Sequence, residues 1–173
     1  MRRRLRRSSA SLRLHSPSPE TTERFGAALA AAIDAAGAVV LLSGPLGAGK
    51  TRFVKGIASV LGIAASSVQS PTFVLAQELP LADGRALVHV DCYRVAGETE
   101  LESAGLLDWL APGALVVAEW AERVPGAWPD DRLEIRFTRG VDENARTLEA
   151  LARGPLAAAL LARWRVGVAP TEK

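Results

Sequence analysis

The sequence predicts a single α/β domain in which a central, mostly parallel sheet is flanked by helices and carries an antiparallel hairpin. Two continuous apolar runs, residues 38–42 and 114–118, are typical of strands that are buried on both faces, as in parallel sheets. The length of 173 residues favours one domain over two. Asp83-Gly84, placed between two further strand-like segments, predicts the hairpin.

The N-terminal elements are predicted from alternation and from helix caps. Leu12 and Leu14 alternate with polar residues, as in a short strand. Ser18 and Pro19 then supply an N-cap and a proline at the first helical position, so a helix is expected from there to Gly37. A second helix follows the first buried run and is expected to stop at Gly62.

The C-terminal half is interpreted in the same way. The arms of the hairpin are residues 73–79 and 85–90, and capping-box spacing at residues 99–102 predicts a helix that continues to about Leu110. The remaining elements are expected to be a half-exposed strand at 133–137, a further strand at 147–150 and a last helix from Pro155.

An arginine-rich N-terminal tail sets the overall charge. Residues 1–15 contain six arginines and no acid, so the rest of the chain carries 15 basic and 19 acidic residues, a net charge of −4. The high isoelectric point therefore reflects the tail and does not indicate a nucleic-acid-binding face on the core. We divide the chain into a basic tail at residues 1–10, a domain at 11–165 and a C-terminal tail at 166–173. For the basic tail we favour an unstructured segment; a contact with RNA or another polyanion and an organelle transit peptide are the alternatives.

Composition narrows the class of protein further. The single cysteine, Cys92, excludes an intramolecular disulfide framework, and no apolar run approaches the roughly 20 residues that span a bilayer. An apolar content of 49% excludes a chain that is disordered as a whole. We therefore expect a folded, cytoplasmic protein.

The most informative segment is a glycine-rich loop between the first buried run and the second helix. Residues 44–51 read Gly-Pro-Leu-Gly-Ala-Gly-Lys-Thr, which is the spacing of a Walker A phosphate-binding loop in the context that such a loop requires. Its glycines let backbone N–H groups surround a phosphate, and the next helix adds its positive N-terminal end. Lys50 is expected to contact the β- and γ-phosphates of a nucleotide, and Thr51 is expected to ligate Mg²⁺.

Two acids are candidates for the metal side of this site. Asp91 ends the strand-like segment 86–91 and Glu119 ends the segment 115–119. In open α/β sheets the ligand lies at the carboxyl ends of the strands, so both acids are placed to face the phosphates. We expect at least one of them to reach Mg²⁺, and an ordinary surface acid is the alternative for each.

Three other positions have a functional and a structural interpretation. Thr72, within residues 70–73, is a candidate for a switch-loop hydroxyl that senses the γ-phosphate, and a plain Ser-Pro turn is the alternative. For His89 we favour a packed or partly exposed strand residue over a catalytic one. Trp120 is interpreted as a core or interface residue because it lacks the basic, aromatic surroundings of a nucleic-acid stacking platform.

Five motifs in a fixed order resemble the TsaE family, the small bacterial ATPase that is required for making threonylcarbamoyladenosine in tRNA. They are GPLGAGKT at 44–51, SPTF at 70–73, HVDCYR at 89–94, ELE at 100–102 and VAEWAE at 117–122. The resemblance covers about residues 11–152, and the second, third and fifth motifs make it specific. Pro45 and Cys92 depart from the family pattern without removing a phosphate- or metal-binding group.

The resemblance implies binding of ATP and Mg²⁺ by a protein that works with the TsaD–TsaB heterodimer. ATP hydrolysis would reset that complex between turnovers, and stable direct nucleic-acid binding is not expected. Asp91 would lie beside the nucleotide and assist hydrolysis with Lys50 and Glu119, and Thr72 would act as the switch hydroxyl. The implied phosphate-binding residues are Leu46, Gly47, Ala48, Gly49, Lys50 and Thr51, the implied Mg²⁺ ligands are Thr51 and Glu119, and Tyr93, Arg94 and Trp120 would shape the site or the partner surface.

Two alternative functions stay open on the residues alone. A small-molecule kinase would need an arginine-rich lid over the γ-phosphate, whereas the longer insert at residues 95–110 is acidic. A nucleotide switch would use ATP binding to order a partner surface, with no need for catalysis. Phosphate transfer to a panel of small molecules would indicate the kinase, and turnover measured with and without TsaD–TsaB would separate the switch from the ATPase.

Overall fold

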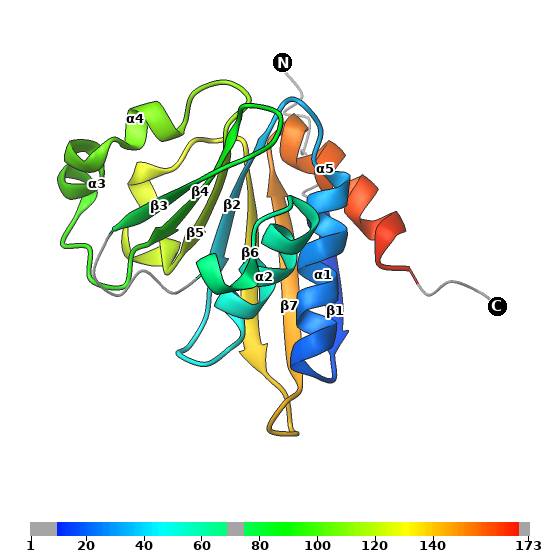
Figure 1. Cartoon of the computed structure of the whole chain (residues 1–173). Helices are drawn as coiled ribbons and strands as arrows, with labels where there is room; N and C mark the ends of the chain where they lie inside the picture. The colour runs from blue at the N-terminus through cyan, green and yellow to red at the C-terminus, as the bar shows by residue number, and fades with distance from the viewer. Residues whose placement is uncertain (1–9, 69–74, 170–173) are drawn as a thin grey trace, which may run out of the picture.

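A mixed sheet of seven strands runs through the part of the chain that the structure, a computed structural model, describes: residues 10–68 and 75–169 (Figure 1). The strand order is β1-β7-β6-β2-β5-β4-β3. The strands are β1 (Ser11–Ser16), β2 (Ala38–Ser43), β3 (Ala76–Pro80), β4 (Ala86–Asp91), β5 (Leu115–Glu119), β6 (Arg132–Arg139) and β7 (Arg146–Arg153).

Parallel pairing occupies the centre of this sheet. Strands β6, β2, β5 and β4 are parallel neighbours, whereas β3 is antiparallel to β4, and β7 is antiparallel to both β6 and β1. The predicted α/β domain with a parallel centre and an antiparallel hairpin is therefore confirmed. The carboxyl ends of β2, β4 and β5 meet at one edge of the sheet, where Asp91 lies directly opposite Glu119.

The helices begin and end close to the predicted signals. Ser18 caps the first helix, because its Oγ accepts the N–H of Thr21 at 3.3 Å. The α-helices are α1 (Pro19–Ala32), α2 (Lys50–Val60), α3 (Glu98–Ala104), α4 (Leu106–Trp109) and α5 (Pro155–Gly167), and the 3₁₀ turns are η1 (Ala65–Ser67), η2 (Ala121–Arg123) and η3 (Pro125–Ala127). None of the helices in the described ranges is long and apolar enough to cross a membrane.

The predicted helix between residues 99 and 110 is wrong in two details. α3 begins at Glu98 with Gly97 as its N-cap, so the capping box is not formed. Glu100 instead accepts the N–H of Ala96 at 2.8 Å. The segment is also split in two, because Gly105 adopts the left-handed conformation (φ 112°) that ends α3 before α4 starts.

One face of the sheet is covered by α1, α2 and α5 and contains the larger core. Inward-facing residues of β2, β5, β6 and β7 pack there beneath the three helices. Phe53 of α2 lies edge-on to both Phe137 and Trp164, with ring centroids 5.6 and 5.9 Å apart. This packing fixes the start of α2 against the carboxyl end of β2, and the phosphate loop is the connection between them.

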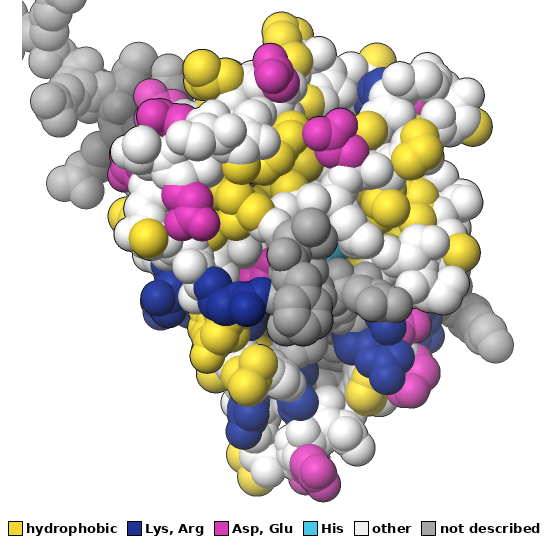
Figure 2. Space-filling model, turned by 60° about the vertical axis from the view of Figure 1, so that its left-hand side comes forward, with side chains coloured by type: hydrophobic (Ala, Val, Ile, Leu, Met, Phe, Trp, Pro, Cys, Tyr) yellow, Lys and Arg dark blue, Asp and Glu magenta, His cyan; other side chains and the backbone are white. Residues whose placement is uncertain are grey.

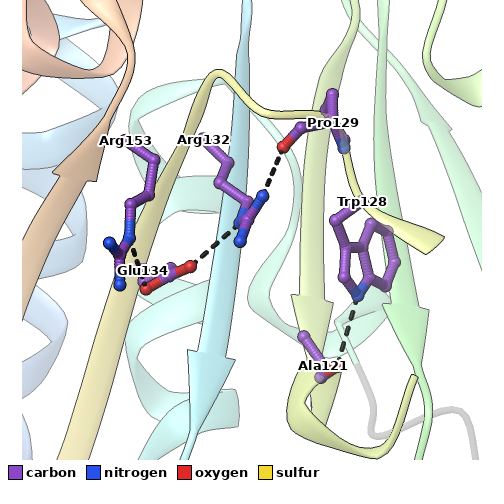
Figure 3. Close-up of polar contacts among 6 residues, drawn as sticks. All are labelled: Ala121, Trp128, Pro129, Arg132, Glu134 and Arg153. Atoms are coloured by element: carbon purple, nitrogen blue, oxygen red, sulfur yellow. Dashed lines mark hydrogen bonds and ion pairs between the residues drawn. The ribbon is translucent and has the colours of Figure 1, made fainter. Parts of the chain in front are cut away.

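The opposite face is only partly covered. α3, α4, η2 and η3 bury the outward residues of β4 and β5, including Val90 and Val116, but they leave the outward face of β6 and β7 uncovered. A groove of about 440 Å³ runs along the boundary, with Trp128 among the residues that line it. Figure 3 shows this boundary. The Trp128 indole N–H donates to Ala121 O at 3.3 Å on one side of it, and Arg132 and Arg153 lie on the other side, on the uncovered face of β6 and β7, called here the open face.

Candidate nucleotide-binding site

The glycine-rich loop occupies residues 44–49 between β2 and α2, as predicted. Gly44 has a φ of 133°, and a Cβ at this position would lie 2.4 Å from the Phe137 carbonyl oxygen, so the loop can pass β6 only with glycine there. Gly49 has a φ of 99° and forms the N-cap of α2. The N–H of Ala48 turns back to donate to Pro45 O at 3.2 Å. The chain therefore forms a tight loop at the N-terminus of a helix, the geometry that binds phosphate groups.

Lys50 is the first residue of α2; its side chain reaches back into this loop, and the residue is only 4% exposed. Its Nζ donates to Gly44 O at 2.7 Å and to Pro45 O at 3.1 Å, and it lies 3.8 Å from the centroid of the Trp120 ring. Burial lowers the pKa of Lys50, while the nearby carboxylates of Glu119, Glu122 and Asp91 act in the opposite direction. The ammonium group is thus held in a desolvated position, where a charge interacts strongly with an anion.

Thr51 and Glu119 meet, although 68 positions separate them in the sequence. The Thr51 hydroxyl donates to the Glu119 carboxylate, at 2.9 Å to Oε1 and 3.1 Å to Oε2. Glu119 is 3% exposed and also lies 3.0 Å from His89 Nε2. Because a carboxylate can only accept, His89 Nε2 carries the proton of this hydrogen bond. The predicted pair of metal ligands is therefore brought together, and a histidine orients one of them.

Asp91 lies on the neighbouring strand, in register with Glu119. Its Oδ1 accepts the N–H of Tyr93 at 2.9 Å, which turns the chain away after β4. Both acids expected at the strand ends therefore lie at the same edge of the sheet as the loop. No group of three or more His, Cys, Asp or Glu side chains suited to a metal ion is found in the described ranges. A hydroxyl and one or two carboxylates suit Mg²⁺, which keeps several waters and takes further oxygens from phosphates.

Trp120 follows Glu119 in a strained conformation. Among the described residues it is the one non-glycine with a positive φ, 57°, and such strain is found mostly where function requires it. Its ring stacks at a tilt against Tyr93, with centroids 4.9 Å apart, and faces the Lys50 ammonium. Trp120 also packs at the edge of the smaller core, as the sequence indicated, and its ring in addition forms part of the wall of the loop.

Sequence reasoning missed four residues that contact the site. His89 is a packed strand residue, as predicted, but its contact with Glu119 was not foreseen, and its Nδ1 has no partner among the described residues. Glu122 accepts the Gly44 N–H at 3.3 Å. Arg139 and Arg146, from the tip of the β6–β7 hairpin, donate to carbonyls of the loop. The alternation His-x-Asp placed His89 near the sheet edge, but no signal in the sequence pointed to the arginines.

Thr72 and Cys92 are the other two positions that were named from the sequence. Thr72 lies outside the described residues. Cys92 is fully buried, and burial raises the pKa of its thiol to about 12, with the charges of Asp91 and Glu122 adding to the shift. At neutral pH the sulfur is therefore protonated, which makes it a packing residue and a poor nucleophile.

A small cavity adjoins the loop on the side of α1 and of the β6–β7 hairpin. It measures about 160 Å³. Its lining residues are Pro19, Thr22, Gly47, Gly49, Arg52, Asn144 and Arg146. Glu119 is not among these lining residues.

Three features define a P-loop NTPase domain. The parallel centre of the sheet leads through a glycine-rich loop into a helix, Lys-Thr stands at the start of that helix, and an acid ends the adjacent strand. Within this class, the family model described as threonylcarbamoyl adenosine biosynthesis protein TsaE matches residues 16–148, and the chain belongs to that family.

Individual relatives agree with the family match. The chain is 39% identical over 142 residues to the tRNA threonylcarbamoyladenosine biosynthesis protein TsaE of Bacillus subtilis, covering 81% of this chain and 86% of the relative. It is 42% identical over 111 residues to the TsaE protein of Streptomyces coelicolor, covering 64% and 74%. The crystal structure of Bacillus subtilis YdiB superposes with a TM-score of 0.72 at 31% identity, covering 91% of this chain and 96% of that one.

Proposed function

We propose that this chain binds ATP with Mg²⁺ and hydrolyses it as a component of the machinery that makes N6-threonylcarbamoyladenosine at position 37 of tRNA. It would act on the TsaD–TsaB complex in the cytoplasm and would not bind tRNA stably itself. The observation that carries the proposal is the convergence of Lys50, Thr51 and Glu119 at the mouth of a phosphate loop. Membership of the TsaE family supports the pathway.

The loop and Lys50 would bind the phosphates of the nucleotide. The ammonium group of Lys50 already has two oxygen acceptors, the carbonyls of Gly44 and Pro45, and nucleotide binding would exchange them for phosphate oxygens. The exchange is favourable because phosphate oxygens carry charge, and charge-assisted hydrogen bonds are roughly twice as strong as neutral ones. The backbone N–H groups at the start of α2 would add to this binding.

The Thr51 hydroxyl and the Glu119 carboxylate fit Mg²⁺ as ligands, directly or through water. When bound, Mg²⁺ would supply positive charge to the β- and γ-phosphates. His89 would fix the orientation of the Glu119 carboxylate, since its Nε2–H donates to Oε1 from a fully buried position. Asp91, opposite Glu119 in the sheet, would orient the attacking water.

The adenosine part of the nucleotide would extend into the 160 Å³ cavity beside Gly47 and Gly49. Glu119 does not line this cavity, so the base would lie apart from the proposed Mg²⁺ ligands. Arg52 and Asn144 supply polar groups along its wall.

Two observations favour a slow ATPase over an autonomous kinase. The insert that forms α3 and α4 carries four acids and no arginine, so it does not resemble a lid that closes over the γ-phosphate. Arg139 and Arg146, which contact the loop, donate to its carbonyls and would have to break these hydrogen bonds to reach the transferring group. A positive group from a partner would complete such a site.

The proposal is tested by reconstituting threonylcarbamoyl transfer to tRNA with purified TsaD–TsaB. We expect product to exceed one equivalent of the complex only when this chain and hydrolysable ATP are both present. A non-hydrolysable analogue that works equally well would indicate the nucleotide switch. Transfer of phosphate to a small-molecule acceptor would indicate the kinase. Multiple turnover without the chain would contradict the proposal.

A further inference from the structure

Two arginines face each other across the end of the β6–β7 hairpin. Arg139, the last residue of β6, is directly opposite Arg146, the first residue of β7, so their side chains leave the same face of the sheet. Like charges in such a pair destabilise a hairpin. The pair is on the face that carries Phe137 and Leu148, beyond the end of the core, where the phosphate loop passes.

Both guanidinium groups donate to the main chain of that loop. Arg139 Nη2 donates to Leu46 O at 2.7 Å, and Arg146 Nη2 donates to Gly47 O at 3.1 Å. Arg146 Nη1 also donates to Glu143 O and Ala145 O, at 2.6 and 2.7 Å, which ties the same side chain to the turn of its own hairpin. Two consecutive carbonyls of the loop are therefore fixed from outside by one hairpin.

Fixing these carbonyls fixes the N–H groups that a phosphate would use. A trans peptide is planar, so the N–H of the next residue points away from the carbonyl. When Leu46 O and Gly47 O face the arginines, the N–H groups of Gly47 and Ala48 are directed to the other side, where the Ala48 N–H donates to Pro45 O within the loop. Gly47 has a φ of 74°, a backbone conformation that favours glycine, and this conformation sets the direction of the two carbonyls.

The positive charge of the two arginines is not neutralised by a carboxylate. None of the ion pairs in the described ranges includes Arg139 or Arg146, in contrast to the arginines at the other end of the same hairpin. Figure 2 shows that the Lys and Arg side chains of the face turned forward gather in its lower half, the hairpin end of the molecule in Figure 1. Two unneutralised guanidinium groups beside a phosphate loop attract a polyanion.

We propose that Arg139 and Arg146 are positioning residues of the nucleotide site: they hold the phosphate loop in its binding conformation and raise its affinity for a nucleoside di- or triphosphate. The choice of ligand rests on the proposed function, whereas the support of the loop by the hairpin does not.

The support of the loop is tested without nucleotide. Hydrogen–deuterium exchange in the peptide that covers residues 44–52 is compared for wild type, Arg139→Ala and Arg146→Ala. We expect exchange in this peptide to accelerate about tenfold in each variant, the effect of losing one hydrogen bond from a charged group. Arg153→Ala is the matched control, because Arg153 is on β7 but pairs with Glu134 on the opposite face. Unchanged exchange in both variants, or equal acceleration in Arg153→Ala, would overturn the proposal.

The effect on the ligand is tested by titrating ATP and ADP with Mg²⁺. We expect both alanine variants to bind about tenfold more weakly, with kcat at saturating ATP much less affected. Arg139→Lys should recover most of the affinity because Arg139 makes one contact with the loop, whereas Arg146→Lys should not, because Arg146 serves three carbonyls. The lysine variants also provide the test if an alanine variant does not fold. Wild-type affinity in all variants would contradict the proposal. A wild-type chain that binds no nucleotide would instead contradict the proposed function, and the exchange experiment would still decide whether the hairpin supports the loop.

Discussion

A pair of directly opposed arginines lies at each end of the paired strands β6 and β7, but the two pairs have different hydrogen-bond partners. At one end Arg132 lies opposite Arg153, and both donate to Glu134, at 2.9 and 3.2 Å (Figure 3). At the other end Arg139 lies opposite Arg146, and both donate to carbonyls of the phosphate loop. Since side chains alternate along a strand, the two pairs are on opposite faces of the sheet.

The difference separates a surface ion pair from a functional contact. Glu134 pairs with both arginines at a position where its side chain is 31% exposed, and exposed pairs of this kind contribute about 0–1 kcal/mol to stability. The loop carbonyls accept one hydrogen bond each from Arg139 and Arg146 without cancelling their charge, and the buried Nε of Arg146 has no hydrogen-bond partner among the described residues. The first pair shares one carboxylate on the uncovered face of the sheet, whereas the second pair has no carboxylate partner in the part of the chain that the structure describes and lies beside the phosphate loop, which is why the hairpin affects the site at one end alone.

The largest effect is expected at the centre of the loop. Lys50→Ala should lower ATP affinity by about 10- to 100-fold and abolish ATP-dependent function, because it removes a charge-assisted contact to the phosphates. Isothermal titration calorimetry measures the affinity, and circular dichroism checks that the fold is intact. Lys55→Ala, further along α2, is the control and should bind ATP normally. An active Lys50→Ala protein with wild-type affinity would contradict the assignment of the loop.

A comparison of two acids sharpens the contrast between the site and the open face. Glu119→Ala should reduce Mg²⁺-dependent hydrolysis about 100-fold and weaken ATP binding far less, since a metal ligand matters most where charge develops on the phosphates. Glu134→Ala should leave hydrolysis unchanged. Initial rates across a Mg²⁺ titration provide the measurement. Equal rates for Glu119→Ala and wild type would show that Glu119 is an ordinary strand-end acid.

The smallest effect, a change in stability, is expected at the end of the hairpin where Arg153 pairs with Glu134. Arg153→Ala should lower the free energy of unfolding by less than about 1 kcal/mol, because an exposed ion pair is screened by solvent. The difference from wild type should shrink further at about 1 M salt, where the screening length is about 3 Å. Urea denaturation at low and high salt measures both values. A loss above about 2 kcal/mol that persists in salt would contradict the distinction between the two ends.

Local signals predicted most of the fold and the centre of the site. The Walker A spacing, the Ser18 cap and the two apolar runs each depend on a few neighbouring residues, and each led to the observed element. The end-of-strand positions of Asp91 and Glu119 also followed from the sequence, because carboxyl ends of parallel strands meet at one edge.

Contacts between distant segments could not be predicted in this way. Arg139 and Arg146 reach loop residues that are 93 and 99 positions away, and only the pairing of β6 with β2 brings them there. His89 looked like an ordinary strand residue because its partner, Glu119, is on the next strand. The helix at 99–110 was predicted as one segment because a single glycine does not reveal in the sequence that it will adopt the left-handed conformation, as Gly105 does between α3 and α4.

Completion of the site by a partner is tested most directly by steady-state phosphate release. The purified chain is assayed with saturating Mg²⁺-ATP, alone and with saturating TsaD–TsaB, and Lys50→Ala provides the background. We predict slow release by the chain alone and stimulation by the heterodimer by at least about tenfold, because a positive group supplied in trans is worth several orders of magnitude in phosphoryl transfer. A fast chain that ignores TsaD–TsaB would contradict the account and would favour an autonomous kinase or ATPase.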